Sequence, residues 1–360
     1  MPRPVAFVSV VPSPYQRDIF GALAQLPELD LRVFYLEAAA PDSPWPEKPL
    51  RDFEKILPGK WISLGHMRWH LNWPLPDLSR FDFVVLNTLM SFTAQPLMRG
   101  ALREKHWIFW GERQRRYAGG WKKIVHDFAS SPLHKAAAIA AVGSAAMDDY
   151  RERFPNTPCV NIPYHCELQP FFDAPPCAHD DQFIFLFCGQ MIARKGLDLL
   201  LAAFAQISPR IPNARLLLVG REAELPGMLQ TLPAAVVNRI EYAGFQAPEK
   251  LPAFFARANA FVLPSRYDGW GVVVNQALAA GLPVICSDTV GAGIDLVHRD
   301  LNGIRFPNGN IAALANAMER LATNRELAEK WGAASREIIR DYTPQRGAER
   351  WLDLFDSLNP

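Results

Sequence analysis

The stretch of sequence that decides the fold is 264–285, which reads PSRYDGWGVVVNQALAAGLPVI. The apolar run 261–263 lies directly before it and predicts a strand, which leads into a loop that contains Gly269 and Gly271. The small and apolar residues from about 272 to 280 predict a helix, which a glycine ends before a proline begins the next strand. This order of strand, loop, helix and strand predicts a βαβ unit of a parallel sheet.

The same loop has the features of a phosphate-binding site. Gly269 and Gly271 allow the backbone to approach a ligand closely. The helix that begins near Val272 presents free N–H groups and a partial positive charge at its N-terminus, and both suit a phosphate. Gln276 lies about one turn into this helix, on the same face as Val272. The alternative interpretation is a capped helix behind a glycine turn that binds no ligand.

A second loop of this kind lies in 185–200, which reads FLFCGQMIARKGLDLL. A buried strand ends at Gly189, the loop carries Arg194 and Lys195, and a helix opens after Gly196. In a doubly wound sheet such a loop lies at the carboxyl end of its strand, where ligands bind. The arginine could bind a diphosphate through two parallel hydrogen bonds, and the lysine could bind it as a point charge. The alternative is a solvated charged loop, which becomes less favoured because two such loops follow strands in one half of the chain.

The rest of the chain continues the alternation of strand-like and helix-like segments, which predicts parallel sheets. Several strand-like segments are apolar at every position, as a sheet with helices on both faces requires. We therefore predict an α/β fold with two doubly wound, Rossmann-like domains of six strands each. The expected strands are 5–11, 31–36, 83–87, 107–110, 138–142 and 160–162 in the first half, and 183–188, 215–219, 239–243, 260–263, 284–287 and 304–306 in the second.

Composition limits the classes of function. The 360 residues, of which 49% are hydrophobic, predict about two globular domains. Lys and Arg number 38 against 37 Asp and Glu, so the net charge of +1 indicates no nucleic-acid partner. The five cysteines include no Cys-x-x-Cys pair, which disfavours a metal site or a disulfide framework. No apolar run is long enough to span a membrane and the N-terminus lacks the pattern of a signal peptide, so we expect a cytoplasmic protein.

The second half of the chain resembles the donor-binding domain of the family-4 retaining glycosyltransferases (glycosyltransferase group 1), which have the GT-B fold. The signature of that family is an acidic residue, a Gly-aromatic-Gly turn, and a second acidic residue eight positions after the first. Asp268, the turn Gly269-Trp270-Gly271 and Gln276 occupy these places. The similarity covers nearly all of 183–322. Further matching positions are Gly281, Pro283, Gly291, Gly293, Asp295, Asn302, Gly303, the loop Arg194-Lys195-Gly196, Val219-Gly220 and Gly244-Phe245.

The resemblance implies that two Rossmann-like domains face each other across a cleft, and that a last helix crosses back to the first domain. We place the N-terminal, acceptor-binding domain at 1–170, the C-terminal, donor-binding domain at 171–343, and the returning helix at 344–360. The proline-rich stretch 167–182 marks the boundary. The proline- and tryptophan-rich insertion 38–76 is either a packed excursion of the first domain or a wall of the acceptor site.

The resemblance also implies roles for individual residues. Arg194 and Lys195 would neutralise the charge on the departing diphosphate, which removes the need for a metal ion. The Asp-x-Asp metal clamp of another large transferase class is absent from the sequence. Asp268 and the backbone of 269–272 would hold the sugar and the phosphates. The expected donor-binding residues are Gly189, Gly269, Trp270, Gly271, Val272, Gln276 at the ribose, and Gly244 and Phe245 at the base.

Three positions depart from the family pattern. Gln190 stands where the family commonly has its first cation, which leaves the charge of the diphosphate to Arg194 and Lys195. Gln276 replaces the second glutamate, so a charge-assisted hydrogen bond to the ribose is lost, and we expect donor binding to be weaker by about 1–2 kcal/mol. Asp268 stands in place of a glutamate, and its side chain is one methylene shorter, which changes its reach toward the sugar.

The acceptor side offers a carboxylate near the end of a strand. The expected strand 107–110 ends just before Glu112, near the place where relatives often have a catalytic histidine. Glu112 is our candidate for an acceptor-facing acid or base, and the alternative is a surface carboxylate paired with Arg113 or Arg115. The other candidates on this side are His126 and His165, each either catalytic or structural, and Tyr15 and Gln16, which open the first helix.

A basic and aromatic patch occurs in the same domain. Between 99 and 123 the chain has eight Lys and Arg against two Glu, with aromatic residues between them. Such a patch would dock on anionic lipid headgroups or bind a phosphorylated acceptor, and the alternative is a solvated helix face with its loop. The aromatic residues are Trp107, Trp110, Tyr117 and Trp121.

These features predict a glycosyltransferase that moves a sugar from a UDP- or GDP-sugar to a glycan or lipid-linked acceptor, with retention and without a metal ion. We expect it in polysaccharide biosynthesis, in the cytoplasm or peripherally at the inner face of the membrane. The alternatives are a nucleotide-sugar epimerase or hydrolase on the same fold, and a non-catalytic protein that binds sugar nucleotides. A nicotinamide oxidoreductase is disfavoured, because the first strand leads into Pro12-Ser-Pro-Tyr15 and not into Gly-x-Gly-x-x-Gly.

Overall fold

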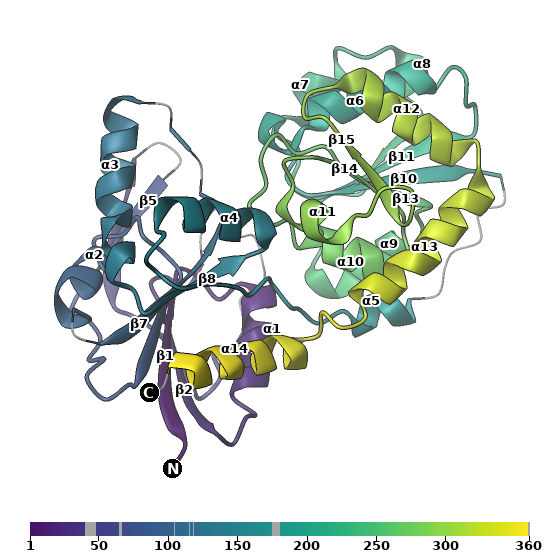
Figure 1. Cartoon of the computed structure of the whole chain (residues 1–360). Coiled ribbons are helices and arrows are strands. Elements are labelled where there is room, and N and C mark those ends of the chain that lie inside the picture. The colour runs from purple at the N-terminus through teal and green to yellow at the C-terminus, as the bar shows by residue number, and fades with distance from the viewer. Residues whose placement is uncertain are drawn as a thin grey trace. The chain divides into compact units, whose positions relative to one another are not determined.

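The chain divides into two compact units (Figure 1). Unit 1 comprises Met1–Cys166 together with Thr343–Pro360, and unit 2 is Glu167–Tyr342. Trp45 of the insertion and Arg115 of the basic patch lie outside the described residues. The residues that this computed structural model describes are 1–39, 48–64, 67–103, 105–114, 116–117, 119–174 and 181–358.

Unit 2 is built on a six-stranded parallel sheet in the order β12-β11-β10-β13-β14-β15. Its central strands carry apolar side chains that are buried on both faces, which is why they lie in the middle of a covered sheet. The strand order reverses between β10 and β13, so the loops that follow these two strands open at the same edge. The strands are β10 (Phe183–Cys188), β11 (Ala214–Val219), β12 (Ile240–Tyr242), β13 (Ala260–Leu263), β14 (Val284–Ser287) and β15 (Gly303–Phe306).

Helices lie on both faces of this sheet (Figure 1). Two of the longer ones begin at an asparagine cap, since the Asn310 and Asn324 side chains accept hydrogen bonds from main-chain N–H groups three residues on, at 2.9 Å. The helices are α5 (Gln169–Asp173), α6 (Leu197–Ile207), α7 (Leu225–Leu229), α8 (Ala234–Val237), α9 (Leu251–Ala256), α10 (Val273–Ala279), α11 (Gly291–Leu296), α12 (Ile311–Ala322) and α13 (Arg325–Ile339), with 3₁₀ turns at Ala193–Lys195 and Pro248–Lys250.

Unit 1 has a seven-stranded parallel sheet in the order β3-β2-β1-β6-β7-β8-β9. Six of these strands correspond to the expected ones, and the parallel sheets of the two units confirm the predicted pair of Rossmann-like domains. The seventh, β3, was not expected, because its Glu-Lys-Ile sequence has no apolar run. The strands are β1 (Arg3–Ser9), β2 (Leu29–Tyr35), β3 (Glu54–Ile56), β6 (Phe83–Leu86), β7 (His106–Glu112), β8 (Ala138–Val142) and β9 (Cys159–Asn161).

Four helices of unit 1, α1, α3, α4 and α14, have 10 to 15 residues. Of the residues in the expected basic and aromatic patch, α3 carries Trp121, Lys122 and Lys123. Trp107 and Trp110 are instead buried in β7, because they belong to the core around the sheet, so they are not part of a surface patch. The helices are α1 (Pro14–Leu23), α2 (Ala94–Pro96), α3 (Gly120–Ser130), α4 (Ser144–Arg153) and α14 (Pro344–Leu358), with a π-helical turn at Leu97–Ala101 and a 3₁₀ turn at Ser131–Lys135.

The insertion 38–76 contributes β3 and an antiparallel hairpin, β4 (Gly59–Leu64) and β5 (Met67–Asn72). Asn72 is fully buried at the end of this hairpin, and its side-chain amide donates to the main-chain oxygen of Leu36 at 2.9 Å. Because Leu36 directly follows β2, this hydrogen bond ties the hairpin to the sheet. The described part of the insertion is therefore packed against unit 1.

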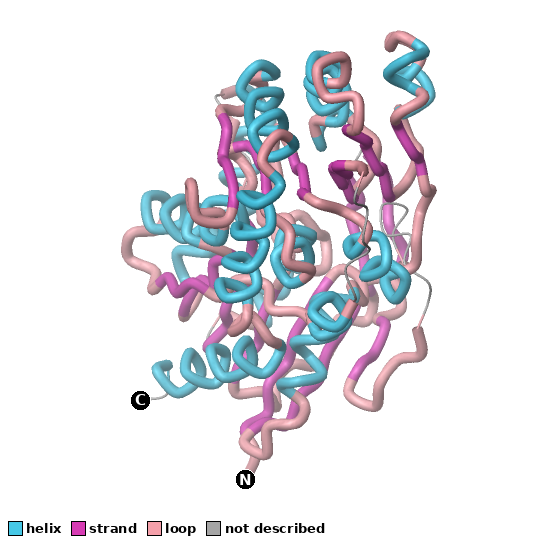
Figure 2. Tube along the Cα trace, turned by 90° about the vertical axis from the view of Figure 1, so that its right-hand side faces the viewer, coloured by secondary structure: helices cyan, strands magenta, loops and turns pink. Residues whose placement is uncertain are grey.

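The last helix, α14, packs beside α1 within unit 1 (Figures 1 and 2). Its Trp351 is fully buried and makes edge-on ring contacts with Phe7 and Trp110, at centroid distances of 5.1 and 5.4 Å. Gly347 keeps the helix close, since a Cβ there would lie 2.8 Å from the Cβ of His165. The prediction of a C-terminal helix that returns to the first domain is confirmed.

His165, which lies beneath α14, makes the stability of unit 1 depend on pH. Burial lowers the pKa of this imidazole to about 4 from an ordinary value of 6.5, although its Nδ1 lies 2.8 Å from the main-chain oxygen of Pro163. Between these two pKa values the unfolded chain binds a proton that the folded chain does not. The stabilisation is therefore complete above pH 6.5 and is lost as the pH falls toward 4, by about 3 kcal/mol in all.

Urea unfolding at several pH values measures this effect. Between pH 7 and pH 4 we expect the unfolding free energy of the wild type to fall by about 3 kcal/mol more than that of His165→Gln, because glutamine does not titrate. Equal pH dependence in the two proteins would show that His165 is not held neutral in unit 1.

Candidate functional site

The two candidate loops of unit 2 lie at the same edge of its sheet. One runs from β10 to α6 and carries Arg194 and Lys195, and the other runs from β13 to α10 and carries Asp268. Because β10 and β13 are neighbouring parallel strands, their loops meet. The Nζ of Lys195 lies 2.5 Å from Oδ2 of Asp268, and Nη1 of Arg194 donates to the main-chain oxygen of Tyr267 at 3.2 Å. The structure thus brings both cations and the acidic residue together.

Gly196 lets these loops approach each other closely. Its φ is +72°, and a Cβ there would lie 1.9 Å from the main-chain oxygen of Pro264. Arg266 adds a second connection, because its guanidinium binds both carboxylate oxygens of Asp198 in α6, at 2.6 and 2.7 Å. The N–H of Arg266 also donates to the main-chain oxygen of Arg194 at 2.9 Å. Backbone contacts as well as charge therefore fix the spacing of the loops.

The ion pair is shielded from water while the second cation is not. Only 17% of the Lys195 side chain and 11% of the Asp268 side chain are exposed, whereas Arg194 is exposed. Asp268 also accepts a hydrogen bond from the Ser265 hydroxyl at 3.3 Å. Coulomb interactions are stronger in such partly buried surroundings than at the open surface. A bound polyanion would compete with Asp268 for Lys195, and the exposed Arg194 is accessible to the same anion.

The turn Gly269-Trp270-Gly271 is held by its tryptophan. The Trp270 side chain is fully buried, and its Nε1 donates to Oδ1 of Asn275 at 3.1 Å. The main-chain oxygen of Trp270 accepts from the N–H of Ala292 at 2.8 Å, and the φ of Gly271 is +90°. The indole therefore anchors the loop in the core, so Trp270 can contact a ligand only through its main chain. Val272 follows this turn, and Gln276 lies half-buried on α10.

Glycines also follow the next two strands at this edge. Gly189 directly follows β10, and a Cβ on Gly220 after β11 would lie 1.8 Å from the main-chain oxygen of Gly189. The N–H of Gly220 donates to the main-chain oxygen of Gly244, after β12, at 2.9 Å. Phe245 follows with an exposed ring. The structure thus places Gly189, Gly244 and Phe245 in one row at the strand ends, next to the loop of Arg194.

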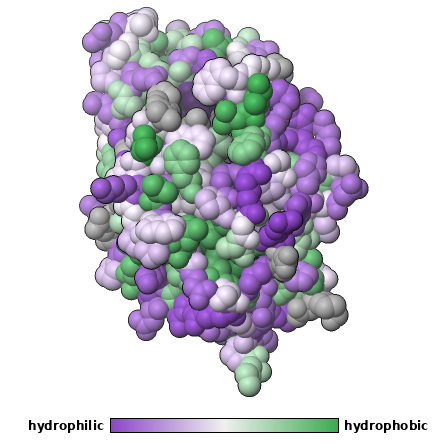
Figure 3. Space-filling view, turned by 90° about the vertical axis from the view of Figure 1, so that its left-hand side faces the viewer, coloured by the Kyte–Doolittle hydropathy of each residue, from purple (hydrophilic) through white to green (hydrophobic). Residues whose placement is uncertain are grey.

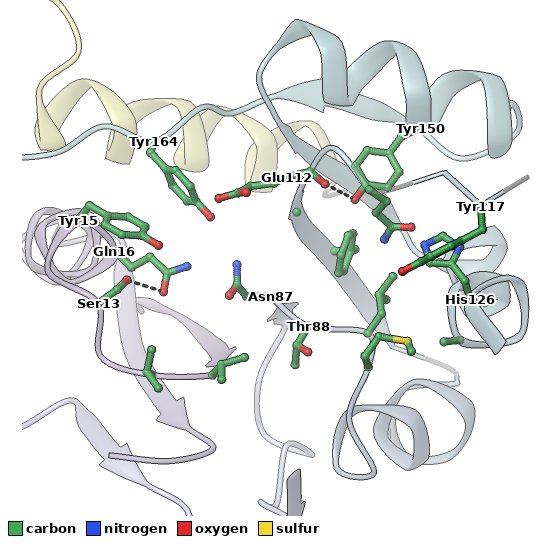
Figure 4. Close-up of a pocket in the computed structure, with 18 residues that line it drawn as sticks. Ser13, Tyr15, Gln16, Asn87, Thr88, Glu112, Tyr117, His126, Tyr150 and Tyr164 are labelled. Carbon is green, nitrogen blue, oxygen red and sulfur yellow. Dashed lines mark hydrogen bonds between the residues drawn. The ribbon is translucent and has the colours of Figure 1, made fainter. Parts of the chain in front are cut away.

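Unit 1 contains a cavity of about 460 Å³ at the carboxyl ends of its strands (Figure 4). Glu112 enters it from the end of β7, and Asn87 enters it directly after β6. Tyr15 and Gln16 from α1 line it as expected. The Tyr164 ring packs against that of Tyr15, with their centroids 4.8 Å apart. The cavity thus combines aromatic faces with amide and carboxylate groups, which is the chemistry that binds sugar rings and hydroxyls.

Two of the three acid/base candidates line this cavity. Glu112 and Tyr164 point toward one another (Figure 4), and burial together with the Glu112 charge raises the pKa of Tyr164 far above its ordinary value. His126 lies beside Tyr117, and burial, followed by the charge of Arg153, lowers its pKa, so the ring is neutral at pH 7. His165 is outside the cavity, beneath α14. The candidates Glu112 and His126 therefore share a site, and His165 does not.

Asn87 and Tyr164 are lining residues that the sequence analysis missed. Asn87 was expected to be the last residue of the strand 83–87, but β6 ends at Leu86, and the Asn87 side-chain amide donates to the main-chain oxygen of Trp110 at 3.2 Å. Its position after a buried parallel strand was a signal that pointed to a ligand site. Tyr164 carries no such signal, because it lies in an irregular segment after β9.

The described residues contain no group of three or more His, Cys, Asp or Glu side chains that could hold a metal ion. Four cysteines in the described ranges are free thiols, and burial raises the pKa of two of them, Cys188 and Cys286, to about 12. In those ranges no helix has both the length and the apolar character of a membrane span.

Comparison with known proteins supports a glycosyltransferase family for unit 2. The family model described as "Glycosyl transferases group 1" matches residues 171–338. An alpha-D-kanosaminyltransferase of Streptomyces kanamyceticus is 26% identical over 55% of this chain and 54% of its own length. A GDP-mannose-dependent alpha-(1-6)-phosphatidylinositol monomannoside mannosyltransferase of Mycobacterium tuberculosis is 31% identical over 42% of this chain and 41% of its own length. The chain thus spans about half the length of these relatives.

Solved structures show the fold over nearly the whole chain. A sucrose-phosphate synthase from Thermosynechococcus elongatus matches with a TM-score of 0.75 and 21% identity, and the match covers 99% of each chain. The HepE protein of Anabaena, in complex with UDP and glucose, matches with a TM-score of 0.72 and 15% identity over 98% of this chain and 99% of that one. The predicted GT-B fold is confirmed.

Gly196→Ala tests the close approach of the two loops. We expect it to lower the unfolding free energy of unit 2 by about 1–3 kcal/mol, because alanine is strained at this φ and its Cβ meets the Pro264 oxygen. Gly227→Ala is the matched control, since that glycine lies in α7 with no atom within 4 Å of the added Cβ. Urea unfolding of both variants measures the difference, and equal stability would contradict the packing described.

Proposed function

We propose that this protein transfers a sugar from a nucleoside-diphosphate sugar, UDP- or GDP-linked, to a glycan or lipid-linked acceptor. The observation that carries the proposal is the meeting of Arg194, Lys195 and the glycine turn at the strand edge of unit 2. This meeting lies inside the segment that matches the group 1 glycosyltransferases. The relatives named as sugar transferases, one of them GDP-mannose-dependent, support the same class of reaction.

The two cations would act on the leaving group. As the bond from the sugar to the diphosphate breaks, negative charge grows on the phosphate oxygens, and Lys195 and Arg194 would stabilise it. Because Lys195 is already oriented by Asp268, its ammonium group is in place before the charge develops. Two such cations supply the charge that a divalent metal supplies in other transferases, and we infer that the reaction requires no added metal.

The rest of the donor would lie along the same edge. Gly189 has no side chain, so its main chain is open to the approach of a phosphate, and the φ of +90° at Gly271 sets the path of the turn. The exposed ring of Phe245 offers a face on which a nucleobase can stack. The Gln276 amide would bind the ribose hydroxyls with neutral hydrogen bonds.

The acceptor would bind in the cavity of unit 1. A sugar ring packs its C–H face on aromatic rings such as Tyr15 and Tyr164, and its hydroxyls bond to the Glu112 carboxylate and the Asn87 amide. In a retaining transfer the acceptor hydroxyl attacks the face from which the diphosphate leaves. The new C–O bond forms as the old one breaks, and a phosphate oxygen takes the proton of the hydroxyl. Glu112 would then orient the acceptor and need not remove its proton.

Two other functions receive less support. A nucleotide-sugar epimerase or hydrolase needs an acidic and a basic side chain close to the sugar. Asp268, the carboxylate of the second donor loop, is instead paired with Lys195. A non-catalytic sugar-nucleotide-binding protein is suggested by Gln276 alone, but the shielded Lys195 and the exposed Arg194 are arranged as a leaving-group site. Transfer assays with and without acceptor distinguish the three functions.

The double variant Arg194→Ala/Lys195→Ala tests the phosphate site. We expect more than a tenfold loss of donor turnover, because the leaving diphosphate loses both cations. The matched control is Arg299→Ala/Arg340→Ala, which removes two exposed cations of unit 2 that lie in other segments. Unchanged turnover in the double variant would place the phosphates elsewhere.

A thermal-shift screen with UDP, GDP and their sugars identifies the donor, since a ligand at about a hundredfold over its Kd stabilises the protein by about 2.7 kcal/mol.

Gln276→Glu tests the ribose contact. We expect the donor to bind more tightly by about 1–2 kcal/mol, because a carboxylate accepts a charge-assisted hydrogen bond from a ribose hydroxyl. Gln230→Glu, at an exposed position after α7, adds the same charge away from the site. Calorimetric titration with the donor found in the screen measures both variants. Unchanged or weaker binding for Gln276→Glu would show that this residue does not face the ribose.

A further inference from the structure

The outward face of α3 is apolar, although it faces solvent. Trp121, Ile124 and Phe128 are spaced three and four residues apart, so they form one stripe on the helix. Their exposed fractions are 65%, 71% and 62%. Three large apolar side chains this exposed on one helix form a patch, which usually marks a contact surface rather than a solvated face.

Cations border this apolar stripe. The Arg99 guanidinium lies over the Phe128 ring at 4.1 Å and donates to the Phe128 main-chain oxygen at 2.6 Å, so it is held beside the stripe. The Nζ of Lys122 lies 5.8 Å from the centre of the Trp121 ring. Lys123 forms an ion pair with Asp127 one turn on, at 2.5 Å. The described surroundings of the stripe therefore carry three cations against one carboxylate.

The opposite side of α3 forms part of the acceptor cavity. His126 and Ala129 line that cavity from this helix, and Ala129 is buried. One side of the helix thus contacts the proposed acceptor, and the other presents the apolar stripe to solvent. Figure 3 views the side of the molecule on which α3 lies in Figure 1, and it shows green apolar areas bordered by purple hydrophilic ones.

We propose that the α3 stripe docks on the surface of an anionic lipid bilayer. Tryptophan, phenylalanine and isoleucine on one helix face enter the boundary between headgroups and acyl chains, while lysine and arginine at its borders bind anionic headgroups. Charge complementarity favours this occupant over an apolar protein surface, since Arg99 and Lys122 border the stripe at Phe128 and Trp121. Docking would hold the cavity beside the bilayer, where a lipid-linked acceptor resides. The inference is independent of the donor chemistry proposed for unit 2.

Vesicle co-sedimentation of the full chain tests the docking. We expect binding to phosphatidylcholine vesicles that contain about one-third phosphatidylglycerol, weaker binding to pure phosphatidylcholine, and a strong decrease as salt is raised. The triple variant Trp121→Ser/Ile124→Ser/Phe128→Ser should bind the anionic vesicles at least tenfold more weakly. The matched control is Leu50→Ser/Val160→Ser/Leu301→Ser, which removes three exposed apolar side chains that belong to other segments than α3 and should bind as the wild type does.

Several outcomes would overturn the proposal. These are a wild type that does not bind anionic vesicles at low salt, a triple variant that binds as well as the wild type, and a stripe that instead mediates self-association in sedimentation velocity. Circular dichroism checks the fold of the triple variant, and the single variant Ile124→Gln repeats the test if that fold is disturbed. Nucleotide binding by the triple variant should remain at the wild-type level, so failure of the docking and failure of the donor site are distinguishable.

Discussion

The ion pair between Lys195 and Asp268 is the contact on which the proposed donor site depends. It joins two loops that are separated by 73 residues in sequence and that follow the neighbouring strands β10 and β13. The pair is possible because Gly196 and Pro264 approach at a distance that no side chain permits. Arg266 supports the same spacing through Asp198. Without this contact the two cations would belong to a solvated loop, and the glycine turn would be only a helix cap.

Much of the fold was predictable from the sequence, because strands buried on both faces are read directly from apolar runs. The central strands of unit 2, β10, β11, β13 and β14, are of this kind, whereas the edge strands β12 and β15 each have an exposed position. β3 was missed because its stability comes from side chains far away in sequence, since its buried Glu54 accepts hydrogen bonds from Arg17 and Tyr35. The hairpin β4–β5 was missed for a similar reason, because its buried anchor is the polar residue Asn72, which bonds to Leu36. Local pattern does not reveal such long-range polar contacts.

Some residues of the candidate site were likewise predictable from the sequence, and others were not. Residues at strand ends, such as Glu112 and Gly189, were found because parallel strands direct their carboxyl ends to one edge. Tyr164 was missed because it reaches the cavity from an irregular segment. The sequence analysis gave the main chain of 269–272 the contact with the ligand, and the structure places the Trp270 indole in the core. In unit 1 the two sides of α3 serve a cavity and an exposed apolar stripe, a division that depends on how the helix packs.

A crystal structure of the protein with UDP or GDP, whichever stabilises it, tests the central claim most directly. The account predicts that the pyrophosphate oxygens lie within hydrogen-bond distance of Nζ of Lys195 and of the Arg194 guanidinium, against the main chain of the glycine turn. A nucleotide bound at another edge of the sheet would contradict it. So would a nucleotide bound here with both cations turned away from its phosphates.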